Sequence, residues 1–152
     1  MMRVVVQAAD FDVSAEMARL HATEHSIGAV VSFTGLVREE DSSDRLISLT
    51  LEHYPGMTER ELTRIAEEAR SRWSLQAVTV IHRFGELKPS DQIVLVLTAS
   101  AHRGAAFEAA QFLMDYLKVS APFWKKEVRQ SGERWIEERC SDDETAARWK
   151  KS

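Results

Sequence analysis

An uninterrupted apolar run at residues 93–97 (IVLVL) constrains the fold of this chain more than any other segment. A strand with one face in water alternates apolar and polar side chains, whereas a continuous run is typical of a strand covered on both faces. A turn signal at residues 88–91 (KPSD) separates this run from another apolar segment at residues 77–83. We therefore expect strands at 77–83 and 92–100, with the second in the centre of a sheet.

Two further segments alternate in the way that predicts half-buried strands. Residues 27–38 and 45–53 are joined by a polar stretch at 39–44, which predicts a hairpin loop. In the second segment the alternation places Ile47, Leu49 and Leu51 on one face. Shorter strands are predicted at residues 1–7, 123–129 and 134–137.

Helix signals lie between these strands. Asp12 can cap a first helix, and residues 58–61 (TERE) form a capping-box signature ahead of an apolar stripe. A third helix is predicted from about 104 to 118, and a second capping box at 141–144 (SDDE) predicts a C-terminal helix and tail over 142–152. The order of the elements predicts one α+β domain over residues 1–152, in which helices pack on a largely antiparallel sheet.

Composition narrows the class of protein. The net charge of −4 argues against a nucleic-acid-binding protein, because binding to phosphate backbones normally needs a broad basic surface. The single cysteine, Cys140, permits no intramolecular disulfide, and no segment approaches the ~20 apolar residues of a membrane span. These features predict a cytoplasmic protein that binds neither nucleic acid nor a membrane.

Common catalytic and metal-binding patterns are missing from the sequence. It has no G-x-x-x-x-G-K, G-x-G-x-x-G, G-x-S-x-G or H-E-x-x-H pattern, which are signatures of nucleotide, dinucleotide, serine-hydrolase and zinc-protease sites. His25, His53 and His82 have no partner at metal-ligand spacing, so we interpret each of them as structural. We expect neither a metal nor a cofactor.

Two lysines on either side of a proline form the most informative candidate site. Pro122 cannot continue a helix, so Lys118 is expected near a helix end and Lys125 near the start of a strand. Two amines held close together repel each other, which favours the neutral, nucleophilic form of a lysine. The alternative is that these lysines only offset the negative end of the helix dipole and face water.

A second basic group follows other predicted elements. Arg38 ends a predicted strand, and His102 and Arg103 begin a predicted helix directly after the buried strand. A helix N-terminus offers free backbone N–H groups, so this junction suits a phosphate or a carboxylate. A solvated helix cap explains the same residues equally well.

Five motifs in one order give the chain a family resemblance. They are FTGLVR at 33–38, LEHYPGM at 51–57, IHRFG at 81–85, SAHR at 100–103 and KVSAPFWK at 118–125. Together they closely resemble the large, catalytic subunit of molybdopterin synthase, over residues 5 to 149. One departure is Leu36, which stands where some members of that family carry a lysine. We do not expect that position to be catalytic.

The resemblance implies an α/β-hammerhead fold and a homodimer that binds two small ubiquitin-like sulfur-carrier subunits, giving a heterotetramer. The tail of each small subunit, a C-terminal thiocarboxylate, would enter a pocket of the large one. The implied reaction adds two sulfurs to cyclic pyranopterin monophosphate and forms the dithiolene of molybdopterin. Because the sulfur arrives on the partner, the resemblance implies that this chain needs no reactive cysteine, metal or cofactor.

The resemblance also gives the basic residues roles. Lys118 is expected to be the principal catalytic residue, assisted by Lys125, and both lysines are expected to contact substrate. Arg38, His102 and Arg103 are expected to hold the pterin phosphate, the last two in the pocket of a neighbouring protomer. Other expected contributors are Arg139, as a weaker candidate for the phosphate site, and Phe33 and Met114, as pocket walls.

Two rival functions remain open from the sequence. A non-enzymatic adaptor for the tail of a ubiquitin-like protein would need a basic groove but not both lysines. A phosphate-ester hydrolase would need a metal cluster or a nucleophile constellation, and the sequence offers neither pattern. The discriminating observation is whether loss of a lysine abolishes turnover or only weakens binding.

Overall fold

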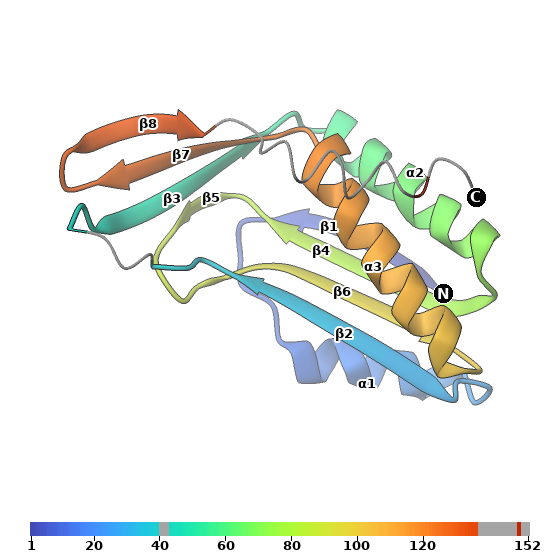
Figure 1. Cartoon of the computed structure of the whole chain (residues 1–152). Helices are drawn as coiled ribbons and strands as arrows, with labels where there is room; N and C mark the ends of the chain where they lie inside the picture. Colours follow the sequence, from blue (N-terminus) through green and yellow to red (C-terminus); the bar gives the residue numbers. More distant parts are fainter. Residues whose placement is uncertain (40–42, 137–148, 150–152) are drawn as a thin grey trace.

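The computed structural model describes residues 1–39, 43–136 and 149 of the chain, and Figure 1 shows its elements. In chain order they are β1 (Met2–Gln7), α1 (Val13–Thr23), β2 (Ala29–Leu36), β3 (Leu46–His53), α2 (Met57–Arg72), β4 (Leu75–Arg83), β5 (Gly85–Leu87), β6 (Gln92–Ser100), α3 (Arg103–Ser120), β7 (Phe123–Arg129) and β8 (Gly132–Ile136). The predicted C-terminal helix and Cys140 lie outside the described residues. Within the described part, no helix is long and apolar enough to cross a membrane.

The larger structural unit is a four-stranded sheet, sheet A, with the order β1-β4-β6-β2. Its β4–β6 and β6–β2 pairs are antiparallel, and β1 pairs with β4 in parallel. Strand β6 has a neighbour on each side, and its side chains from Val94 to Ser100 are buried. The central position predicted from the run at residues 93–97 is therefore confirmed.

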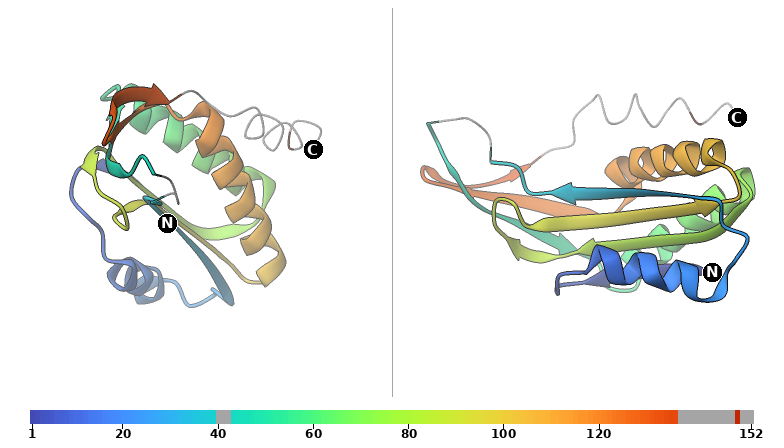
Figure 2. Two further views of the ribbon diagram at one scale, coloured as in Figure 1. Left: turned by 60° about the vertical axis from the view of Figure 1, so that its left-hand side comes forward. Right: turned by 90° about the horizontal axis from the view of Figure 1, so that it is seen from below.

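Helices cover both faces of sheet A, as Figures 1 and 2 show from three directions. Helices α2 and α3 pack on one face, where Val78 and Val80 of β4 join their core. Helix α1 packs on the other face, where Ala77 and Ile81 of the same strand join a second core. Because alternate residues of a strand point to opposite faces, one strand serves both cores.

A second sheet, sheet B, has the order β5-β3-β7-β8 and extends away from the end of α3 (Figure 1). All of its strand pairs are antiparallel. The α+β class is confirmed, and the strands form two sheets. Strand β5 was not predicted, since its three residues are too short to show a pattern.

The face of β3 differs from the prediction at its first residues. Ile47 was expected inside with Leu49 and Leu51, but 52% of its surface is exposed, while Leu46 and Ser48 are buried. The pairing of β3 with β7 shifts between Leu46 and Ser48, which leaves Ile47 as an extra residue. A β-bulge of this kind exchanges the faces of the residues before it, so strict alternation fails there.

Helix α2 begins earlier than its predicted cap. The position before the helix is Gly56, with φ 87°, and the Glu59 carboxylate accepts a hydrogen bond from the Gly56 N–H at 2.5 Å. Thr58 is buried inside the first turn, and its hydroxyl donates to the Tyr54 carbonyl at 2.8 Å. The capping box predicted at Thr58 is therefore wrong by two residues, because Gly56 can adopt the positive φ of this turn. For α1 the prediction is confirmed: Asp12 accepts a hydrogen bond from the Ala15 N–H at 3.1 Å.

Candidate active site

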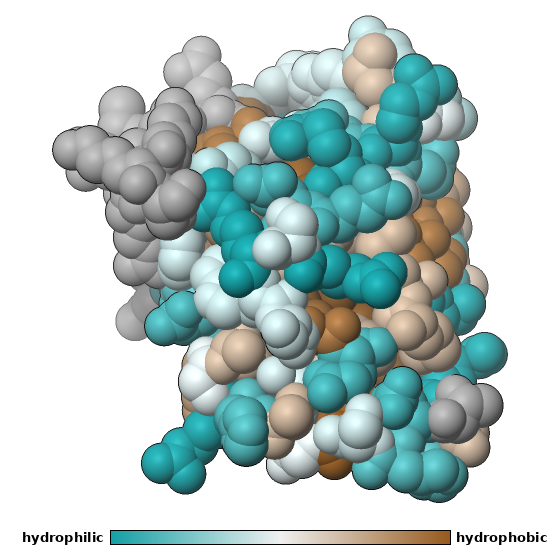
Figure 3. Space-filling model, turned by 90° about the vertical axis from the view of Figure 1, so that its right-hand side faces the viewer, coloured by the Kyte–Doolittle hydropathy of each residue, from teal (hydrophilic) through white to brown (hydrophobic). Residues whose placement is uncertain are grey.

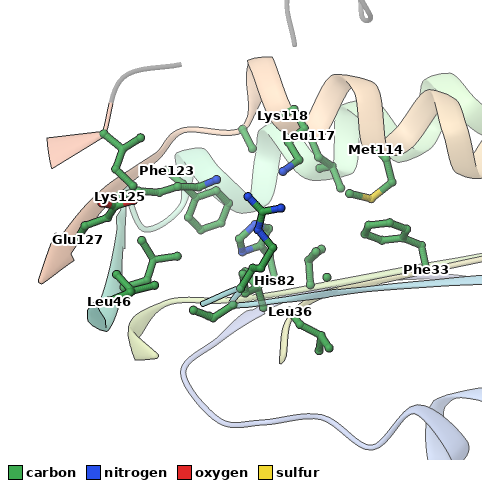
Figure 4. Close-up of a pocket in the computed structure, with 18 of the residues that line it drawn as sticks. Phe33, Leu36, Leu46, His82, Met114, Leu117, Lys118, Phe123, Lys125 and Glu127 are labelled. Carbon is green, nitrogen blue, oxygen red and sulfur yellow. The ribbon is translucent and has the colours of Figure 1, made fainter. Parts of the chain in front are cut away.

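A pocket of about 470 Å³ opens where the end of α3 meets the ends of the two sheets. Figure 4 shows side chains from α3, β7 and sheet A converging on it. Its basic residues include Arg38, Lys118, Lys125 and Arg129, and its apolar walls include Phe33, Leu36, Met114, Leu117 and Phe123. Such a combination of cations and ring-sized apolar walls suits a flat anionic ligand.

The break at Pro122 brings the two lysines to one pocket. Helix α3 ends at Ser120, and Ala121 adopts an extended conformation with φ −68° and ψ 126°. The Phe123 N–H then donates to the Ala121 carbonyl at 2.8 Å, which turns the chain into β7. Lys118 lies in the last turn of α3 and Lys125 in β7, and both line the pocket. The predicted division of the lysines between a helix end and a strand is confirmed.

The two lysines lie on different kinds of secondary structure. Lys125 pairs through its backbone with Leu51 of β3 on one side and Ile136 of β8 on the other, so it lies within sheet B. Lys118 is exposed near the end of a helix. The neighbouring Lys126 does not line the pocket; its ammonium lies 3.7 Å from the Glu133 carboxylate and over the Trp135 ring.

Arg38 reaches the pocket from a segment that is fixed by a turn. The Val37 N–H donates to the Asp91 carbonyl at 2.9 Å, and the Val37 carbonyl accepts from the Ser90 N–H at 2.7 Å. These two bonds tie the residue before Arg38 to the turn at residues 88–91. Arg38 thus lines the same pocket as Lys118 and Lys125.

Gly35 lines the pocket near Phe33, at a position with no room for a side chain. A Cβ atom on Gly35 would lie 2.8 Å from Cγ1 of Val94 on the neighbouring strand, closer than real contacts allow. The register of β2 shifts directly after Gly35, which changes the direction of the chain towards Arg38. Phe33 and Met114 line the pocket, as expected.

His82 also lines this pocket, although we interpreted it from the sequence as structural. It continues the row of Val78 and Val80 on the α3 face of β4, at the end where the pocket begins. Its ring stacks on Phe123, with 3.8 Å between centroids and 18° between planes. Burial lowers the pKa of His82 to about 4, and the nearby charges of Lys125 and Lys118 act in the same direction.

The outer wall of the pocket holds a carboxylate that is already paired. Glu127 accepts a hydrogen bond from Arg129 Nε at 2.6 Å, and Arg134 Nη2 lies 3.2 Å from the same oxygen. The Arg129 hydrogen bond is the main reason that the pKa of Glu127 is lowered. The buried Arg129 also donates to the Asp44 carbonyl at 2.9 Å, so this wall is cross-linked to the start of β3.

Two predicted site residues, His102 and Arg103, do not line this pocket. His102 and Arg103 are exposed at the start of α3, 18 residues long, and a rise of 1.5 Å per residue separates Arg103 from Lys118 by roughly 20 Å. Figure 3 views the end of the molecule to which the start of α3 belongs, where hydrophilic residues surround smaller apolar patches. Arg139 lies outside the described residues.

The fold and the pocket define a small α+β protein with a pocket that combines basic and aromatic side chains, which suits an anionic ligand. Among the described residues, no group of three His, Cys, Asp or Glu side chains could hold a metal ion. Lysine and arginine N–H groups can bind a phosphate or carboxylate and can stabilise negative charge that develops on a reacting oxygen.

Known proteins match both the sequence and the fold. Residues 6–120 match the family model described as MoaE protein. A molybdopterin synthase catalytic subunit of Mesorhizobium japonicum is 57% identical over 151 residues, covering 98% of this chain and 94% of the relative. The solved MoaE protein of Burkholderia ambifaria has a TM-score of 0.84 at 50% identity and covers 98% of each chain. A structure of subunits 1 and 2 of the molybdopterin-converting factor from Helicobacter pylori has a TM-score of 0.72 at 20% identity, covers 91% of each chain and shows a shared fold.

The chain therefore belongs to the MoaE family, the family of the molybdopterin synthase catalytic subunits.

Proposed function

We propose that the pocket at the end of α3 is where this chain, a molybdopterin synthase catalytic subunit, transfers sulfur to a pterin. The chain is an enzyme of molybdenum cofactor biosynthesis, as its family membership shows. The proposed sulfur donor is the C-terminal thiocarboxylate of a small ubiquitin-like partner, and the proposed acceptor is cyclic pyranopterin monophosphate. Two transfers give the dithiolene of molybdopterin.

One observation carries this proposal: Lys118 and Lys125, from a helix end and a strand, line one pocket with Arg38. Once the tail sulfur is bonded to the pterin, water adds to the acyl carbon, and this carbon passes through a tetrahedral state with negative charge on oxygen before the carbon–sulfur bond breaks and leaves a carboxylate. An ammonium group next to that oxygen stabilises the charge, and it can also supply or accept the protons that move. We assign this role to Lys118, assisted by Lys125 from the adjoining strand.

The remaining basic residues of the predicted site are proposed to bind the pterin phosphate. Arg38 is within the pocket, and its guanidinium can pair with two phosphate oxygens at once. His102 and Arg103 are roughly 20 Å along α3, so we propose that they enter the pocket of a second copy of this chain in a homodimer. Arg139 is proposed as a further phosphate ligand.

The partner is proposed from the chemistry and from a related assembly. The Helicobacter pylori structure is described as a protein–protein complex of subunits 1 and 2 of the molybdopterin-converting factor. A thiocarboxylate tail is narrow, flexible and anionic, which fits a cationic pocket with an opening at the end of a helix. We propose that two such partners bind a homodimer of this chain, giving a heterotetramer.

Reconstitution of the reaction tests the function. The native chain is mixed with thiocarboxylated partner and cyclic pyranopterin monophosphate, and the dithiolene product is measured. We expect product with the native chain and none with Lys118→Ala, although Lys118→Ala still binds the partner. Native-like turnover by Lys118→Ala would remove the central assignment. Stable binding of the partner without product from the native chain would favour the adaptor function instead.

A further inference from the structure

We propose that Gly28 and Thr98 are positioning residues that fix the start of α3. Through this fixed backbone they set the direction of the His102 and Arg103 side chains. The inference rests on the proposed function, because it concerns how these two basic residues reach the pocket of a second copy of this chain. Neither Gly28 nor Thr98 carries a charge, so both would act only through the backbone that they hold.

Gly28 touches the segment that leads into α3. It directly precedes β2, and its N–H donates to the carbonyl of Ser100, the last residue of β6, at 3.0 Å. A Cβ atom on Gly28 would lie 2.2 Å from the carbonyl oxygen of Ala101. Favourable carbon–oxygen contacts lie at about 3.3 Å or more, so a side chain here would displace Ala101 by roughly 1 Å. The place of Ala101, the neighbour of His102, therefore depends on a residue without a side chain.

The need for glycine at this position is steric. In the described part of the chain, the glycines with positive φ are Gly56, Gly85 and Gly132, and Gly28 is not one of them. A residue with a side chain can therefore adopt the backbone conformation of Gly28. What it cannot do is leave the Ala101 carbonyl where it is. Gly28→Ala is thus expected to fold with a displaced start of α3.

Thr98 holds the start of α3 from the side of the sheet. Its side chain is fully buried, and its hydroxyl donates to the Ala106 carbonyl, near the start of the helix, at 2.7 Å. The buried Ser100 adds a third anchor, since its hydroxyl donates to the Ser74 carbonyl at 3.1 Å. The backbone is therefore held on each side of His102 and Arg103.

The residues that this fixed backbone carries are exposed. Ala101, His102 and Arg103 all face solvent in the single chain, and Figure 1 shows the start of β2 beside the loop from β6 into α3. His102 makes no side-chain capping bond, so the junction is not built for the greatest helix stability. A fixed backbone lowers the entropy that basic side chains lose when they bind an anion. The anchors thus suit a preformed binding element that one chain presents to another.

Substitution of Gly28 tests the step from contact to binding. We expect Gly28→Ala to raise KM for the pterin about fivefold and to change kcat by less than about twofold, since misdirected binding residues weaken binding. In an Arg103→Ala background, where the contact is already lost, Gly28→Ala should change KM by about twofold or less. The full fivefold effect in that background would show that Gly28 acts elsewhere and would overturn the proposal. A native KM for Gly28→Ala alone would overturn it as well.

Thr98 offers a matched pair of substitutions at the other anchor. Thr98→Val keeps a similar shape but removes the hydroxyl that holds Ala106, whereas Thr98→Ser keeps the hydroxyl and loses a methyl group. We expect Thr98→Val to raise KM for the pterin about threefold and Thr98→Ser to keep a nearly native KM. A raised KM in Thr98→Ser with a native KM in Thr98→Val would show a packing role instead. That result, or a native KM in both variants, would refute the role of Thr98.

Mixing of two inactive or weakened chains shows where Gly28 acts. In a mixed dimer, a Lys118→Ala chain supplies an intact start of α3 to the pocket of a Gly28→Ala chain. We expect added Lys118→Ala chains to lower the KM of Gly28→Ala towards the native value. A loss of structure confined to the Gly28→Ala chain could not be repaired in this way.

The matching mixture with Arg103→Ala separates the two levels of the proposal. Recovery of Arg103→Ala by Lys118→Ala chains, without recovery of Gly28→Ala, would overturn the role of Gly28 and leave the shared site intact. Absence of recovery in both mixtures would refute the shared site of the proposed function, and the positioning role would fall with it.

Discussion

The two ends of α3 carry similar basic residues but offer them in different ways. At its C-terminal end, Lys118 joins Arg38, Lys125 and His82 around a pocket that one chain builds. At its N-terminal end, His102 and Arg103 are exposed, and the helix has no side-chain cap on its first turn. A basic residue in the sequence therefore says little about a site until the fold shows which other groups it meets.

Substitutions in the pocket at the C-terminal end of α3 should have the largest effect on turnover. Lys125 and Lys126 are adjacent residues of β7 on opposite faces of sheet B, so they form a matched pair. We expect Lys125→Ala to lower kcat about a hundredfold or more, because a group that stabilises charge or moves a proton is lost. We expect Lys126→Ala, which breaks an ion pair between the half-buried Lys126 and the exposed Glu133, to keep nearly native turnover. Similar losses in both variants, measured in the reconstituted reaction, would argue against a specific site.

The buried His82 should make the free energy of unfolding of the protein depend on pH. An imidazole whose pKa falls from 6.5 to about 4 on folding binds fewer protons in the native state, so the free energy of unfolding rises with pH across that window. The contribution is complete above about pH 6.5 and is lost as the pH falls towards 4, with a limit of about 3 kcal/mol.

Urea unfolding at pH 7 and pH 4.5 measures this contribution. We expect His82→Phe to flatten the pH dependence of the free energy of unfolding, whereas the exposed His25→Gln should leave it unchanged. A native protein that is equally stable at both pH values would contradict the buried, neutral state of His82.

The start of α3 should affect substrate binding. We expect Arg103→Ala to raise KM for the pterin about tenfold, because one charged contact to a phosphate is lost, while kcat changes less. A mixture of Arg103→Ala and Lys118→Ala chains should regain activity, since a mixed dimer holds one intact site. Absence of any recovery after subunit exchange would place Arg103 outside a site shared between protomers.

The smallest effect concerns the missing cap of α3. Helix α1 has a capping Asp12 that accepts from the Ala15 N–H, whereas His102 makes no such bond. We expect His102→Ser to stabilise the protein by about 0.5–1 kcal/mol, by satisfying a free N–H group, and to raise KM for the pterin. Thermal unfolding and steady-state kinetics on one preparation measure both effects. A gain in stability with an unchanged KM would mean that His102 does not contact substrate.

Much of the fold was predictable because local rules decided it. The run at residues 93–97 gave the central strand, Asp12 gave a helix start, and Pro122 separated Lys118 from Lys125. The face of Ile47 was not predictable, since the bulge that exposes it depends on the partner strand β7. Single-strand patterns carry no information about the register between strands.

The site was predictable only in part for a similar reason. The motifs pointed to the lysines and to Arg38, which the pocket brings together. His82 continues the buried row of Val78 and Val80, and only the packing of Phe123 against it shows that this row ends in the pocket. By contrast, the sequence did predict that His102 and Arg103 begin the helix whose other end holds Lys118, and the structure confirms it.

The most direct test of the central claim follows the tail of the partner rather than the pterin. Thiocarboxylated partner and cyclic pyranopterin monophosphate are incubated with the native chain or with Lys118→Ala, and the partner is weighed by mass spectrometry over time. Replacement of the tail sulfur by oxygen lowers its mass. We predict conversion that requires both the pterin and the native chain, and an unchanged thiocarboxylate bound to Lys118→Ala. Conversion by Lys118→Ala at the native rate would contradict the role of this pocket in sulfur transfer.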